Sequence, residues 1–167
     1  MLKEVSLENL TKVRNLLVVE NPPELTVEQV EILLVVSCKS QDRLERLEAL
    51  WSLINVTVGK NIDELFMQPK VFDMLTLVHE QAKTVNDMQI IDLLLQIFVN
   101  LDHSGKIIQK ELYDQFSARD VLFDLSQRNN LPLFMIRSVL AFCWCVSEFH
   151  IDNQKEEKSD LPDSVVL

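Results

Sequence analysis

The feature that most constrains the fold is a repeat in the pattern of apolar side chains. The segment Trp51-Ser-Leu-Ile-Asn55 superposes on the segment Gln96-Ile-Phe-Val-Asn100 at a shift of 45 residues. The helix expected to end with the first segment carries apolar residues in steps of three and four, and the helix expected to end with the second is apolar almost throughout. The sequence therefore predicts helical units that repeat along the chain.

Apolar spacing is helical over nearly the whole chain, and the composition agrees with it. Only two glycines occur in 167 residues, whereas sandwiches and barrels need many turns and therefore many glycines. This disfavours an all-β fold and a glycine-rich phosphate loop. The segments expected to be helical are 7–19, 26–38, 42–58, 61–68, 70–82, 87–101, 107–116, 118–127 and 132–150.

The repeat length and the number of helices in each unit indicate the architecture. A short helix followed by two longer ones in a unit of forty-odd residues is typical of armadillo and HEAT arrays. We expect an all-α, right-handed solenoid of about three repeats over residues 1–152, followed by an acidic, flexible tail at 153–167. Segments 87–101 and 132–150 are apolar on every side, which predicts that neighbouring helices bury them completely.

The net charge of −10 and the pI of about 4.7 restrict the partners. Nucleic-acid binding needs clustered Lys and Arg, so DNA and RNA are not expected, and a charged partner should be basic. No apolar stretch reaches the length of a membrane span, so no membrane contact is expected. Three cysteines (Cys38, Cys143 and Cys145) form no regular disulfide framework, which favours a reducing compartment and a cytoplasmic or nuclear location.

The segment Trp51-x-x-x-Asn55-x-x-x-Gly59 resembles an armadillo repeat of the importin-α family. The similarity extends over about residues 10 to 150, and Asn100 falls on the next asparagine of the family's ladder. The departures are Gln96 in place of the second ladder tryptophan, and Ala141 and Cys145 in place of the third Trp and Asn. The basic autoinhibitory N-terminal segment of the family is also missing from this sequence.

The resemblance implies a nuclear-import adaptor that binds extended, Lys/Arg-rich localisation peptides in a concave groove. In such a groove asparagine amides hold the peptide backbone, and tryptophan packs against lysine stems with cation–π attraction. Acidic residues near the same helix ends bind the cationic groups of the peptide. The residues expected to line this groove are Trp51, Asn55, Gln96, Asn100, Glu64 and Asp102.

Other functions remain open. Because Gln96, Ala141 and Cys145 depart from the ladder, the groove is alternatively that of a scaffold that binds another subunit or a helix through apolar surface, as part of a larger complex. Residues 100–111 also resemble the loop of an EF-hand calcium sensor. Neither an enzyme nor a metal or other cofactor is expected. The cysteines at 143 and 145 point to opposite sides of a helix, and no nucleophile has a base beside it in a known motif.

Overall fold

The computed structural model describes residues 5–68, 70–115, 118–128 and 130–159. This part of the chain is helical and contains no strand, which confirms the all-α prediction. The elements are α1 (Leu7–Leu16), α2 (Val27–Lys39), α3 (Arg43–Thr57), α4 (Ile62–Phe66), α5 (Val71–Thr84), α6 (Met88–Asp102), α7 (Lys106–Gln115), α8 (Ala118–Ser126), the short 3-10 helix η1 (Leu133–Met135) and α9 (Ile136–Ser159).

The spacing of 45 residues is present in the helix boundaries. Asp42 caps α3 by accepting a hydrogen bond from the backbone N–H of Leu44, and Asp87 caps α6 in the same way through the N–H of Ile90. Both helices have 15 residues, and Pro132 precedes η1 at the next equivalent position, so Asp42, Asp87 and Pro132 follow one another at intervals of 45. Caps of this type satisfy N–H groups that a helix start leaves without a partner.

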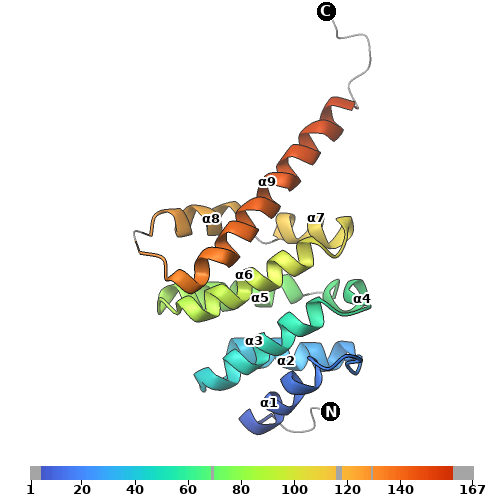
Figure 1. Ribbon diagram of the computed structural model, residues 1–167, viewed down its shortest axis with the longest axis vertical. Coiled ribbons are helices and arrows are strands. Elements are labelled where there is room, and N and C mark those ends of the chain that lie inside the picture. The colour runs from blue at the N-terminus through green and yellow to red at the C-terminus, as the bar shows by residue number, and fades with distance from the viewer. Residues whose placement is uncertain (1–4, 69, 116–117, 129, 160–167) are drawn as a thin grey trace, which may run out of the picture.

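The long helices of successive units lie side by side in chain order. In Figure 1 the elements follow one another along the longest axis, from α1 at one end to α9 at the other. Helix α3 packs between α1 and α6, and α6 packs between α3 and α9. Helices α2 and α5 also pack against each other and against α3 and α6, respectively. The core runs continuously between these helices and is densest along α6, where Ile90, Ile91, Leu94, Ile97, Phe98 and Leu101 have no exposed surface.

Polar contacts fasten α6 to both of its neighbours at one end. Arg43 at the start of α3 donates from Nε to Oδ2 of Asp87 at 2.6 Å. Arg128, after α8, donates from Nη1 to Oδ1 of Asn86 at 2.7 Å. The hydrogen bond from Arg43 lowers the pKa of the Asp87 carboxyl below its ordinary value. The start of α6 is therefore held by charged groups from the unit before it and the unit after it.

The prediction that neighbouring helices bury these two segments holds for most apolar side chains of α6 and is wrong for α9. Leu140 and Trp144 of α9 are 65% and 64% exposed, because α6 covers one side of α9 and no described element covers the opposite side.

Helix α9 also continues to Ser159, beyond the domain boundary expected at residue 152, while residues 160–167 of the expected tail lie outside the described residues. Leu133–Ile151 is long and apolar enough to cross a membrane, unlike the sequence expectation, although a helix of a water-soluble protein passes the same test.

Candidate functional site

A groove lies where α6 and α9 meet, and it contains two of the residues expected from the sequence. Its volume is about 450 Å³, and it is open to solvent at the surface. Side chains from three successive units line it: Ile54 of α3, Gln96, Val99 and Asn100 of α6, and Phe134, Arg137, Ser138 and Ala141 of η1 and α9. One spacing thus brings residues from three distant parts of the chain to one surface.

The Gln96 side chain is oriented by a buried carboxylate one helical turn earlier. Its Nε2 donates to Oδ2 of Asp92 at 3.0 Å. Asp92 is only 8% exposed, and its other carboxylate oxygen is buried without a hydrogen-bond partner among the described residues. Because the amide nitrogen of Gln96 is held by Asp92, its carbonyl oxygen remains available to accept a hydrogen bond from a ligand.

The Asn100 side chain is held in a similar way, by a residue of the preceding unit. Its Nδ2 donates to Oγ1 of Thr57 at 3.0 Å, and that buried hydroxyl donates in turn to the backbone carbonyl of Ile54 at 2.7 Å. The two bonds fix Asn100 against the end of α3. The side-chain oxygen of Asn100 is again left to accept a bond, so both groove amides are positioned as acceptors.

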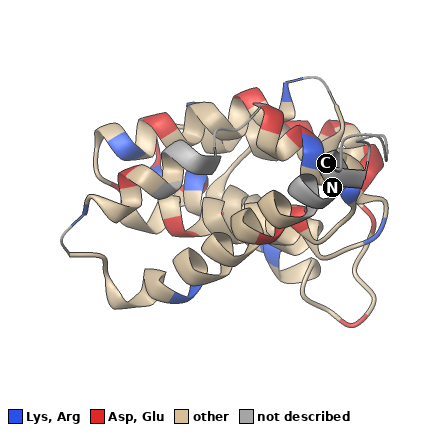
Figure 2. Ribbon diagram, turned by 90° about the horizontal axis from the view of Figure 1, so that it is seen from above, with Lys and Arg blue, Asp and Glu red and all other residues tan. Residues whose placement is uncertain are grey.

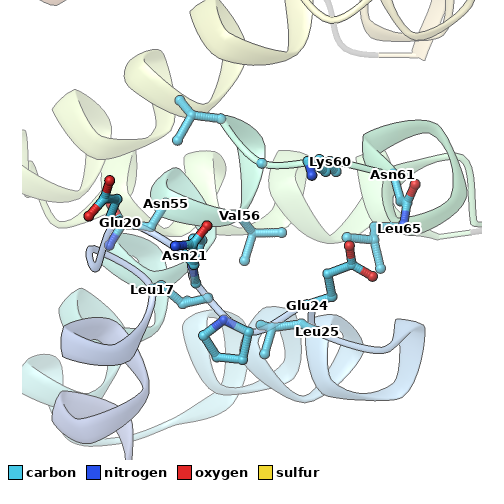
Figure 3. Close-up of a pocket in the computed structure, with 14 residues that line it drawn as sticks. Leu17, Glu20, Asn21, Glu24, Leu25, Asn55, Val56, Lys60, Asn61 and Leu65 are labelled. Carbon is cyan, nitrogen blue, oxygen red and sulfur yellow. The ribbon is translucent and has the colours of Figure 1, made fainter.

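The expected residues of α3 lie beside this groove rather than in it. Asn55 is half-buried and lines a hollow of about 310 Å³ between the loop that follows α1 and the loop that follows α3. Figure 3 shows Glu20 and Asn55 on one side of this hollow and Lys60 and Asn61 on the other. Trp51, one turn before Asn55, is 37% exposed and therefore presents part of its indole to solvent.

The two acidic residues expected in the groove lie elsewhere. Glu64 on α4 is exposed and lines a separate shallow hollow with Gly59, Asn61 and Ser104. Asp102 is buried and its Oδ1 accepts a hydrogen bond from Nε2 of Gln109 at 3.1 Å. Asp102 therefore turns toward α7, and the placement expected from the sequence is wrong because the next short helix covers that carboxylate.

The charges near the groove differ from those of a uniformly acidic surface. Arg137 is the charged residue among those lining the groove, where no carboxylate lies. Glu20 and Glu24 line the hollow at Asn55, together with Lys60. Viewed from above, acidic and basic residues are spread over several helices rather than gathered in one patch (Figure 2). The carboxylates therefore lie in the hollow at the end of α3, and the basic Arg137 lies in the groove at α9.

The EF-hand interpretation does not agree with the backbone. Residues 100–102 are the last turn of α6, and α7 begins at Lys106, so most of the twelve residues are helical. A calcium loop needs those residues in an open loop whose oxygen atoms point inward. Gly105, with a φ of 153°, serves the sharp connection between α6 and α7.

A second cluster joins α6 to α9 but has the character of a structural contact. One potential ligand atom from each of Asp102, His103 and Cys145 lies within 4.8 Å of the others. Burial, with the carboxylate of Asp102 beside it, raises the pKa of the Cys145 thiol to about 12. The Cys145 thiol therefore remains protonated at neutral pH. The His103 ring is engaged within its own helix end, because its Nδ1 lies 2.6 Å from the backbone carbonyl oxygen of Val99. Of the two cysteines considered in the sequence analysis, Cys145 belongs to this cluster and Cys143 does not.

For the part of the groove that comes from η1 and α9, sequence reasoning pointed to Ala141, in place of the third ladder tryptophan, but did not identify Phe134 or Ser138. Phe134 is 56% exposed at the groove, and Arg137 and Ser138 follow it. The signal that points to them is the same spacing of 45, which makes residues 134–141 equivalent to residues 89–96 of α6 once α9 is aligned with α6 from Pro132. Comparisons of the chain with protein-family models, with curated proteins and with solved structures found no match.

Proposed function

We propose that the chain is a short armadillo-type solenoid of about three repeats and a non-catalytic, protein-binding module that resembles a nuclear-import adaptor. In this proposal an extended peptide crosses the ends of α3 and α6 and enters the groove at α9. The observation that carries the proposal is the pair of oriented amides, Gln96 and Asn100, in a groove formed by three successive units. An extended backbone has N–H groups that such acceptors bind without reading the peptide sequence.

The direction of the peptide follows from the charges. Lysine or arginine side chains belong at the α3 end, where Trp51 offers an exposed indole and Glu20 and Glu24 offer carboxylates. Attraction of a cation to an indole contributes about 0.5–2 kcal/mol, depending on how far the pair is desolvated. Arg137 repels a cation at the other end, so the segment of the peptide in the groove is neutral or acidic.

A specific observation also favours a second candidate function. Four of the side chains that line the groove are apolar (Ile54, Val99, Phe134 and Ala141), and Arg137 is its charged group. This lining suits a scaffold that binds a helix or another subunit through apolar contacts. An apolar interface holds as ionic strength rises, whereas attraction between exposed charges weakens.

The experiment is a fluorescence-anisotropy titration with two labelled peptides of equal length, at low and high salt. One peptide is rich in lysine and arginine, and in the other these residues are replaced by serine. We expect salt-sensitive binding of the basic peptide, about tenfold weaker affinity in Asn100→Ala, and a similar loss in Trp51→Ala. Asn15→Ala on exposed α1 is the matched control and should bind like the parent chain.

The second candidate is distinguished in the same titration. Binding of both peptides with equal affinity, independent of salt, would support the apolar scaffold. No binding of either peptide at high micromolar concentration, or an undiminished affinity in Asn100→Ala, would contradict the groove proposal.

A further inference from the structure

The outer side of α9 carries an apolar stripe that the peptide groove does not use. The stripe consists of large side chains that are strongly exposed: Leu133 (85%), Ile136 (42%), Leu140 (65%), Trp144 (64%) and Ile151 (52%). None of these five side chains lines the groove, although their neighbour Arg137 does. Figure 1 shows that the second half of α9 projects beyond the other helices.

The stripe is a continuous face of one helix. A step of about 100° per residue places Ile136, Leu140, Trp144 and Ile151 within an arc of about 80°. The side chains that pack into the core, Ser138, Phe142 and Val146, lie on the opposite side of α9. Helix α9 is therefore apolar on two faces, and only one of them is covered in the described part of the chain.

The exposed area is large for a protein without a partner at that surface. With side-chain areas of roughly 150–250 Å², the exposed fractions amount to an apolar surface on the order of 600 Å². The largest apolar patch on a typical monomer covers about 300–600 Å² and is often functional, and the stripe lies at the upper end of that range. A specific interface buries about 800 Å² on each partner, and the stripe alone would supply most of that area.

We propose that the apolar stripe is a self-association surface, on which a second copy of this chain packs its own α9 in the antiparallel direction. In this arrangement a two-fold axis passes midway between Leu140 and Trp144. Leu140 of each copy then lies opposite Trp144 of the other copy. The same register sets Leu133 opposite Ile151 of the second copy. One axis thus pairs four of the five residues of the stripe, and Ile136 falls at the level of Glu148 of the second copy; such self-complementarity is what a two-fold interface requires.

The charges at the border of the stripe agree with this register. Arg137 and Glu148 are both exposed, and they lie on the same side of the stripe, eleven residues and about three turns apart. Neither forms an ion pair with another residue in the described part of the chain. In an antiparallel pair the same borders meet, so Arg137 lies beside Glu148 of the second copy, twice in the dimer. In a parallel pair opposite borders would meet instead, so Arg137 would not lie beside Glu148 of the second copy.

The test measures the mass of the full chain by sedimentation velocity, from low to high micromolar concentration. We expect a dimer, and a dissociation constant at least about 30-fold higher in Leu140→Glu. Leu77→Glu, which places the same change at an exposed leucine of α5, is the matched control and should leave the dimer intact. Equal helix content by circular dichroism shows that both variants are folded.

The register is tested by exchanging the charges. Arg137→Glu alone and Glu148→Arg alone should each weaken the dimer, and a mixture of the two variants should form a heterodimer. Monomers at every concentration, or a dimer that Leu140→Glu does not weaken, would overturn the proposal. Binding of the monomer to neutral phosphatidylcholine vesicles would also overturn it, in favour of a membrane surface. These results are independent of peptide affinity, so the groove proposal succeeds or fails separately.

Discussion

The packing of α9 on α6 depends on one aromatic residue, and its truncation gives a prediction with a definite size. Phe142 has no exposed surface, and its ring centroid lies 6.1 Å from that of Phe98 in the middle of α6. Truncation of a buried phenylalanine to alanine costs about 3–5 kcal/mol, which includes the cavity left behind. The pair of rings accounts for about 0.5–1.5 kcal/mol of such a loss. We expect Phe142→Ala to lower the free energy of unfolding by about 3–4 kcal/mol.

This loss is a large share of the stability of a domain, which is typically about 5–15 kcal/mol. The assay is urea unfolding followed by circular dichroism. The control is Phe123→Ala on α8, where the ring is 68% exposed and the expected loss is below about 0.5 kcal/mol. If Phe142→Ala cost no more than Phe123→Ala, the account of α9 as a helix packed on α6 through this residue would be wrong.

Three further predictions concern titratable groups. The hydrogen bond from Arg43 holds the pKa of the Asp87 carboxyl low in the folded chain. The stabilisation that this ionised carboxylate gives the fold is present above the ordinary carboxyl pKa of about 4 and is lost as pH falls through the folded pKa. Asp87→Asn should therefore make urea unfolding less sensitive to acid. Burial lowers the pKa of the His79 imidazole. The stability of the fold should therefore decline as pH falls from about 6.5 through the folded pKa. His79→Gln should remove that decline from melting curves recorded at several pH values. Burial raises the pKa of the Cys145 thiol to about 12. A thiol reagent at neutral pH should therefore react with Cys145 at least about a hundredfold more slowly in the native chain than in urea. Comparable rates would show that the thiol is accessible.

The sequence predicted the helices and their period because both depend on local patterns. Apolar spacing located the segments 42–58 and 87–101, where the structure has two 15-residue helices. The same spacing placed Gln96 and Asn100 on one surface. These features need only the helical geometry of a single segment and its repetition.

The sequence did not predict which faces are covered, because burial depends on neighbours from other units. Asp102 was expected at the surface, but Gln109 of the following helix binds its carboxylate. Leu140 and Trp144 were expected in the core, but α6 covers only the other face of α9. Arg137 was visible in the sequence, yet its place in the groove depends on how η1 sets the start of α9. Composition alone does not distinguish a buried helix from one with an unpartnered face.

The most direct test of the central claim observes the groove amides themselves while a peptide binds. In a ¹⁵N-labelled sample the side-chain NH₂ signals of Gln96 and Asn100 and the indole signal of Trp51 are each resolved by assignment through substitution. On titration with a Lys/Arg-rich peptide, we expect these three signals to shift together and to saturate with one dissociation constant. If the peptide left all three unchanged while other signals moved, it would bind elsewhere, and the groove formed by α3, α6 and α9 would not be the peptide site.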